Sequence, residues 1–172
     1  AATTRNGRIG VIGTEATIKS GTYTFHIKAI NPSIEVFNKA CPLFVPLIEE
    51  TCSDEEDEVA LQDLKNRAVQ RYLHEFNRKE IDTLVLGCTH YPLLKDTIDA
   101  FMGEKVTLID SAKETAQEVA RLLNEMHLYN ETRRELKRLY FVTDAADRFI
   151  YLGSRFLGKP MENVQEVEIK SL

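Results

Sequence analysis

The sequence contains little cysteine and no long apolar run, and both scarcities narrow the class of protein. Its three cysteines, Cys41, Cys52 and Cys88, are odd in number and have no repeat-like spacing, so they do not resemble a disulfide framework. We therefore expect a reducing, cytoplasmic location. No apolar run approaches the roughly 18 residues of a membrane span, and no charged-then-apolar signal segment occurs, so we expect no membrane partner.

An excess of positive charge is also absent, since 22 Lys and Arg residues stand against 27 Asp and Glu residues. The formal net charge of −5 disfavours nucleic acid as the main partner, because phosphate binding needs a positive surface. Hydrophobic residues at 43% and charged residues at 28% are ordinary for a globular chain and argue against wholesale disorder. A length of 172 residues suits one α/β domain, or one domain with part of another.

Strands and helices are predicted to alternate along the chain. Short β-branched or apolar runs predict strands at residues 8–14, 34–41, 81–87, 106–110, 138–143 and 164–169. Apolar stripes at helical spacing predict helices at residues 15–30, 55–76, 92–102, 112–127 and 145–157. The stretch CPLFVPLIEE, residues 41–50, contains two prolines and is predicted to be a loop or short helix. This alternation predicts an α/β fold, a three-layer αβα sandwich with a mainly parallel sheet.

Two polar clusters directly follow predicted strands. The first is Gly13-Thr14-Glu15-Ala16-Thr17, and the second is Gly87-Cys88-Thr89-His90. In open parallel sheets, ligands bind beyond the carboxyl ends of the strands, and the helix N-termini that follow favour an anion such as a carboxylate. The threonine hydroxyls of both clusters add hydrogen-bond donors. The sequence therefore predicts an anion site at this edge of the sheet.

Cys88 is the strongest candidate for chemistry. A helix N-terminus and a protonated His90 both stabilise a thiolate, which can act as a nucleophile or as a general base. A buried structural thiol is a common alternative, and the Thr-His that follows Cys88 favours a functional interpretation. Cys41 and Cys52 lack such neighbours and are interpreted as structural.

Several classes of site fit the residues around Cys88 poorly. A thiol phosphatase would need an Arg after the Cys, where Leu93, Leu94 and Lys95 stand instead. No compact second pair of Cys or His completes a zinc site, and no Gly-x-Gly-x-x-Gly follows the first strand, so we expect neither a metal nor a cofactor. A thiol hydrolase with a Cys–His pair and a thiol acid/base that moves a proton on an amino acid both remain open.

Three segments carry a specific family resemblance. LVLGCTHYPLL, RIGVIGTEATIKSGTY and ACPLFVPLIEE together resemble the glutamate racemase family of the aspartate/glutamate racemase superfamily, in the family's order. The resemblance covers essentially the whole chain and is weaker after about residue 112. It implies cofactor-independent interconversion of L- and D-glutamate by two cysteine bases, D-glutamate for peptidoglycan, and a homodimer. A racemase of aspartate or a related acid, and a non-catalytic module that binds carboxylate or associates, are the alternatives.

The resemblance also assigns residue roles. It implies that Cys88 is one of the two bases, the one that takes the proton from L-glutamate, with His90 as its proton partner. Glu49 matches an acidic residue that supports the His. Thr14, Thr17 and Thr89 match positions that bind the substrate, Thr14 and Thr17 through its carboxylate.

Two family segments have no counterpart here. No Asp-Ser-Gly loop occurs, and no Ala-Cys-Asn-Thr segment supplies the other catalytic Cys. Together with the start at Ala1 rather than Met, this predicts a C-terminal portion that lacks about the first hundred residues of the racemase and is inactive alone. Residues 1–110 are then expected to be the second of two similar α/β domains, and residues 111–172 a segment that returns to complete the first. From the residues alone, a seam is expected near 109–113 or near 130.

Overall fold

The computed structural model describes residues 1–50, 55–130 and 137–168 of the chain. The chain divides into two compact units, residues 1–128 and residues 129–172, each of which is described by itself below. The division falls close to the polar stretch near residue 130, one of the two seams that the sequence predicts.

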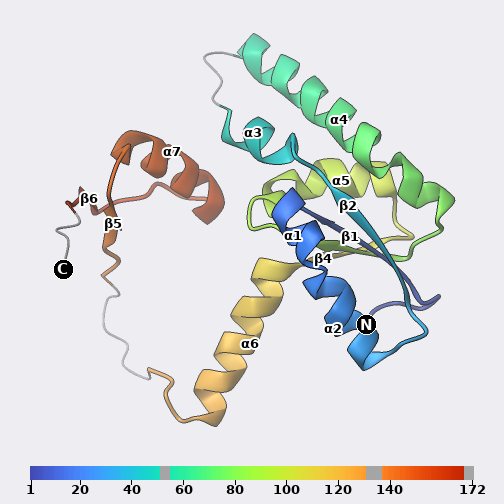
Figure 1. The fold of residues 1–172 in the computed structure, drawn as a ribbon. Coiled ribbons are helices and arrows are strands. Elements are labelled where there is room, and N and C mark those ends of the chain that lie inside the picture. Colours follow the sequence, from blue (N-terminus) through green and yellow to red (C-terminus); the bar gives the residue numbers. More distant parts are fainter. Residues whose placement is uncertain (51–54, 131–136, 169–172) are drawn as a thin grey trace. The chain divides into compact units, whose positions relative to one another are not determined.

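The first unit is built on a four-stranded, fully parallel sheet (Figure 1). Its order is β2-β1-β3-β4, with bounds β1 Arg8–Gly13, β2 Glu35–Ala40, β3 Thr83–Leu86 and β4 Thr107–Asp110. The helices of this unit are α1 Glu15–Ser20, α2 Thr22–Ile30, α3 Phe44–Glu49, α4 Glu55–Arg78, the 3₁₀ turn η1 Tyr91–Leu94, α5 Lys95–Met102 and α6 Ser111–Glu125. The central strands β1 and β3 are the most buried, as near-continuous apolar runs predict.

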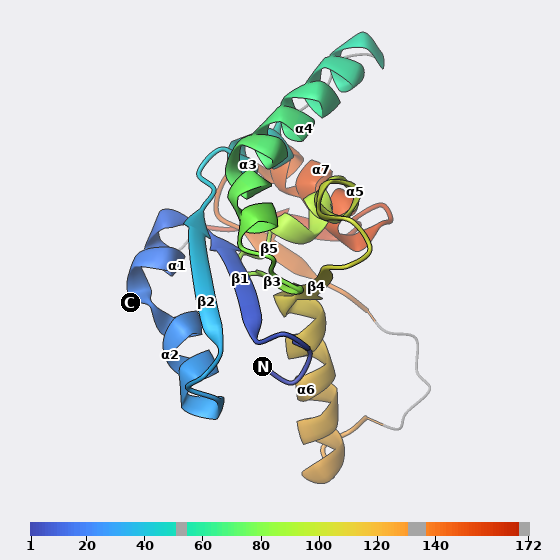
Figure 2. The same ribbon diagram turned by 90° about the vertical axis from the view of Figure 1, so that its right-hand side faces the viewer.

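Side chains that alternate along the strands form a core on each face of the sheet. Ile9 and Val11 of β1 pack with Ile27 of α2 on one face. Ile12 of β1 and Leu84 of β3 lie in the larger cluster on the other face, together with buried residues of α3, α4 and α5. Figure 2 shows α1 and α2 on one side of the sheet and α3, α4 and α5 on the other. The predicted three-layer αβα sandwich is confirmed.

The prediction of one helix over residues 15–30 is wrong. Gly21 has φ of 66°, ends α1 through a hydrogen bond from its N–H to the Ile18 carbonyl, and begins α2. A left-handed φ suits glycine, so the chain turns there at little cost. Within the stretch predicted to be a loop or short helix, residues 44–49 form the short helix α3. The helix predicted from Pro92 begins instead as the 3₁₀ turn η1, which precedes α5.

A buried carboxylate fixes the segment that enters β1. Asp82, at the amino end of β3, accepts hydrogen bonds from the hydroxyls of Thr4 (2.6 Å) and Thr83 (2.9 Å). It also accepts bonds from the backbone N–H groups of Arg5 (2.6 Å) and Asn6 (2.7 Å). Burial alone would raise the pKa of Asp82, but these hydrogen bonds lower it below the ordinary value. No local pattern in the sequence distinguishes Asp82.

Helix α6 begins at the carboxyl end of β4 with a firm N-cap and has no buried residue. The Asp110 carboxylate accepts from the N–H groups of Ala112 and Lys113. The apolar residues Val119, Leu122 and Leu123 of α6 are exposed.

In the described ranges, no helix is both long and apolar enough to cross a membrane.

The second unit contains the parallel pair β5 Tyr140–Val142 and β6 Val164–Glu166, connected through α7 Ala146–Leu157. Both strands are shorter than the predicted 138–143 and 164–169. Phe141 of β5 and the preceding Leu139 are exposed, and β5 pairs only with β6 within the described residues. An exposed apolar strand edge of this kind favours association with another strand.

Candidate active site

The two polar clusters predicted from the sequence lie at the carboxyl ends of neighbouring strands. Ile12 pairs with Leu86 in the β1–β3 register, and the N–H of Gly87 donates to the Ile12 carbonyl at 2.8 Å. From β1 the chain passes to β2 on one side, whereas β3 lies on the other side. Such a reversal of strand order is where open parallel sheets bind ligands.

The close approach of the two strand ends depends on glycine. A Cβ at Gly87 would lie 2.8 Å from the Ile12 carbonyl oxygen and 2.9 Å from the ring of Tyr23. A Cβ at Gly13 would lie 3.1 Å from the Thr17 side chain. These two glycines therefore set the spacing between the polar clusters.

The threonine cluster after β1 is organised by hydrogen bonds of its own. Thr14 is the N-cap of α1, and its hydroxyl oxygen accepts from the Thr17 N–H at 3.3 Å. The hydroxyls of Thr14 and Thr17 are 3.0 Å apart, and both side chains are half-buried. The structure thus brings the two predicted carboxylate-binding hydroxyls together at the carboxyl end of β1. The cap is a sufficient structural role for Thr14, so its contact with a substrate stays a prediction.

The segment Cys88-Thr89-His90 forms a tight turn that leads into η1. The N–H of Tyr91 donates to the Cys88 carbonyl at 3.2 Å, and the N–H of Leu93 donates to the His90 carbonyl at 3.0 Å. Cys88 is half-buried and Thr89 is exposed. The thiol is therefore neither a core side chain nor a fully solvated one, as a reactive cysteine requires.

His90 is held by a carboxylate from a distant part of the chain. Its Nε2 lies 2.9 Å from Oε1 of Glu49, the last residue of α3, and 27% of each side chain is exposed. Its Nδ1 lies 3.4 Å from the Thr89 hydroxyl, which is long for a hydrogen bond. The structure thus brings together Glu49 and His90, two residues that only the family resemblance predicts to be partners.

Tyr91, which was not among the predicted site residues, anchors this turn. Its ring is buried and packs edge-to-face on Phe44 of α3, with ring centroids 5.1 Å apart. Its hydroxyl donates to the Cys41 carbonyl at 3.1 Å, so one side chain ties the turn after β3 to the end of β2. An aromatic residue beside His90 was the available signal. Ser111, also missed, donates to the Leu86 carbonyl at 2.8 Å and anchors α6 to the same strand end.

The other cysteines fall outside this arrangement. Cys41 is fully buried, and burial raises the pKa of its thiol to about 12, with Lys39 lowering it and Glu75 raising it to smaller extents. At neutral pH it is therefore an unreactive thiol, consistent with its structural interpretation. Cys52 lies outside the described residues. Among the residues that are described, no group of three or more His, Cys, Asp or Glu could hold a metal ion.

The arrangement combines a thiol, an imidazole with a carboxylate partner, and hydroxyls at one edge of the sheet. The hydroxyls suit an anionic group, and the thiol and imidazole suit proton transfer or nucleophilic attack. Hydrolysis and proton transfer on a bound carboxylic acid both remain compatible with this geometry.

Comparison with known proteins narrows these possibilities. The profile of the family described as Asp/Glu/Hydantoin racemase matches residues 1–119. Glutamate racemase from Geobacter metallireducens is 47% identical over 171 residues, which is 99% of this chain and 61% of the relative. Glutamate racemase from Chlorobaculum tepidum is 42% identical, over 95% of this chain and 58% of the relative.

The solved structures that resemble this chain are also named glutamate racemase. Glutamate racemase from Francisella tularensis, crystallised with D-glutamate, matches 96% of this chain and 59% of its own, with TM-score 0.81 and 35% identity. An isoform of glutamate racemase from Bacillus anthracis matches 98% of this chain and 60% of its own, with TM-score 0.83 and 33% identity. The chain thus spans about three fifths of the length of these proteins.

Proposed function

This chain belongs to the Asp/Glu/hydantoin racemase family, and from that premise we propose that it contributes one half of the active site of a glutamate racemase. The observation that carries the proposal is the Cys88-Thr89-His90 turn at a strand end, with His90 held by Glu49 at 2.9 Å. The relatives that align with nearly the whole chain are named glutamate racemase. We propose a cytoplasmic enzyme that supplies D-glutamate for peptidoglycan.

In the proposed reaction, the Cys88 thiolate removes the proton from Cα of L-glutamate. The S–H bond forms as the C–H bond breaks, and the electron pair stays on the substrate as a carbanion. A second thiol then delivers its proton to the opposite face and becomes a thiolate, so the proton count is unchanged after one turnover. Two bases on opposite faces invert the centre without turning the substrate over.

The weak acidity of Cα–H is the main obstacle, because the adjacent carboxylate is already negative. Hydroxyl donors of Thr14, Thr17 and Thr89 around that carboxylate reduce the charge that the carbanion must carry. His90 serves as proton partner of Cys88, and its contact with Glu49 fixes the orientation of the imidazole. No cofactor takes part in this scheme.

The second base lies outside this chain in the proposal, and the share of each relative that the chain covers supports this. We propose that residues 1–110 are the second domain of the enzyme and that residues 111–172 return to complete the first. The end of β4 at Asp110 and the exposed apolar residues of α6 and β5 support this division. The chain alone is then expected not to racemise glutamate.

The test uses the full-length protein that contains this chain. Cys88→Ser should abolish racemisation in both directions, which circular dichroism monitors in reactions started from L-glutamate and from D-glutamate. The variant should also abolish exchange of the α-proton of L-glutamate in D2O. Cys41→Ala is the matched control, because it removes a buried thiol that no step uses, and it should retain activity. Two-way racemisation by Cys88→Ser would refute the proposal. Parallel assays with aspartate decide between glutamate and a related acid.

Association without catalysis is the second candidate function. The exposed apolar residues Leu139 and Phe141 lie on a strand that pairs with β6 alone in the described part of the chain, and they favour pairing with a second chain, as in a homodimer. Light scattering on the chain alone tests this proposal. A strictly monomeric chain with the second unit folded would count against it.

A further inference from the structure

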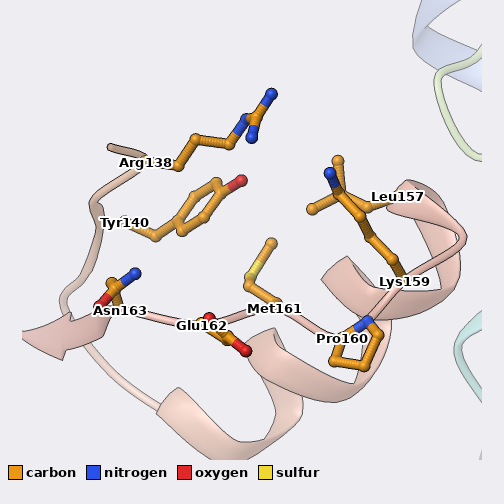
Figure 3. A pocket seen from close by; sticks show the side chains of 8 residues that line it. All are labelled: Arg138, Tyr140, Leu157, Lys159, Pro160, Met161, Glu162 and Asn163. Carbon is orange, nitrogen blue, oxygen red and sulfur yellow. The ribbon is translucent and has the colours of Figure 1, made fainter. Parts of the chain in front are cut away.

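The second unit contains a cavity whose residues take no part in the candidate active site. Its volume is about 330 Å³, at the lower end of the range for small-molecule sites, and eight residues line it (Figure 3). All of them come from the start of β5 and the segment before it, the end of α7 and the loop that leads into β6.

The walls of this cavity are built by hydrogen bonds. The Ser154 hydroxyl of α7 accepts from the Met161 N–H at 2.9 Å, and the Tyr140 N–H donates to the Asn163 carbonyl at 3.1 Å. Gly158 ends α7 in the left-handed conformation. A Cβ at Gly153 would collide with the Met161 side chain, so that glycine lets the thioether lie against the helix. The loop is therefore positioned before any ligand arrives.

The lining combines cations with apolar surface. Arg138, Lys159 and the phenol of Tyr140 direct their polar ends toward the open space between them, and Met161 lies among them (Figure 3). No ion pair is found for Arg138 or Lys159 within the described residues, and Glu162 is the single acidic residue of the lining. The cavity thus has a positive balance and two cations available to a ligand.

We propose that this cavity binds a small organic anion, a carboxylate or phosphate monoester attached to an aromatic or apolar group. The anionic end would lie between Arg138 and Lys159 and accept from the Tyr140 hydroxyl. The apolar group would lie against Met161 and the ring of Tyr140. Inorganic phosphate and a neutral phenol each satisfy only half of this requirement, and they should bind more weakly than the combined molecule.

The experiment measures binding of phenyl phosphate to the ¹⁵N-labelled chain by NMR titration, with inorganic phosphate and phenol in separate arms. Saturable shifts should concentrate on residues 138–142 and 157–164. Arg138→Ala and Lys159→Ala should each weaken binding about fivefold, because an exposed charge contact contributes up to about 1 kcal/mol. Lys137→Ala is the matched control, since it removes a neighbouring charge outside the lining, and should change affinity less than about twofold.

Far-UV circular dichroism of each variant verifies that the second unit stays folded. Three results would overturn the proposal: no saturable binding of phenyl phosphate, equal binding of inorganic phosphate, or equal weakening by Lys137→Ala and Arg138→Ala. Arg138→Lys keeps the charge and should retain more affinity than Arg138→Ala, which separates a charge contact from a packing defect.

Discussion

Asp82 offers the sharpest prediction of stability, because it is 7% exposed and its carboxylate accepts four hydrogen bonds. Each hydrogen bond to a charged group stabilises the fold by roughly 1.5–3 kcal/mol. Residues 4–6, here called the strap, would become disordered without the carboxylate, and the conformational entropy they regain would offset roughly 1–2 kcal/mol of that loss for each residue. We therefore expect Asp82→Ala to lower the free energy of unfolding of the first unit by about 3–5 kcal/mol.

Asp82→Asn should be milder, at about 2 kcal/mol. Its amide oxygen can face the N–H groups of Arg5 and Asn6, and its NH2 can face the hydroxyls of Thr4 and Thr83, which can also accept. Urea unfolding followed by far-UV circular dichroism measures the loss, and amide hydrogen exchange at Arg5 and Asn6 reports the strap directly.

The pH dependence of this effect has a definite sign. Since the pKa of Asp82 is lowered in the folded state, its stabilisation is complete above the ordinary carboxyl pKa of about 4 and is lost as pH falls through the lower folded value. The difference in stability between the natural chain and Asp82→Asn should be constant from about pH 7 to pH 5 and shrink below about pH 4.

Asp99→Asn is the control for Asp82, because its carboxylate is 52% exposed and lies 4.0 Å from the Lys95 ammonium. It should cost less than about 0.5 kcal/mol. Equal urea midpoints for Asp82→Ala and Asp99→Asn would refute the reasoning about the buried carboxylate.

Three further predictions concern the candidate site. Glu49→Gln should lower kcat of the full-length racemase about tenfold, because the charge that orients the imidazole is lost, whereas Glu50→Gln should leave kcat unchanged. Equal rates for the two variants would contradict the pairing of Glu49 with His90. Gly87→Ala should destabilise the first unit by about 2–3 kcal/mol in urea unfolding, since its Cβ would meet a backbone oxygen, and an unchanged midpoint would contradict the close approach. Iodoacetamide followed by peptide mass spectrometry should label Cys88 in the native chain but Cys41 only after unfolding, because a pKa of about 12 leaves about one thiolate in ten thousand at about pH 8. Equal native labelling would contradict the burial of Cys41.

The sequence predicted the sheet well because its signals are local. The apolar run before Gly87 and the β-branched run before Gly13 each mark a buried strand and its end, so the two polar clusters were predicted at one edge of the sheet. Gly21 was missed as a helix break, because the helical pattern continues on both sides and the left-handed φ appears only in three dimensions.

Contacts between distant residues were beyond local reasoning. Glu49 and His90 are 41 positions apart, and only the packing of α3 against the turn after β3 brings them together. The family resemblance, not any pattern of spacing, supplied that pair. Asp82 lies within the predicted strand 81–87, and no local pattern marks it, because three of its four donors come from residues 4–6, more than 75 positions earlier in the chain.

The anchoring of α6 has a mechanical consequence for the strand edge. Its first residue, Ser111, is bonded to the Leu86 carbonyl, two positions before Cys88, while the rest of this helix of 15 residues is unburied. At about 1.5 Å per residue the helix is a rod about 22 Å long, fixed at one end. A force applied to the far end of α6 would therefore act on the last peptide of β3, two positions before Cys88.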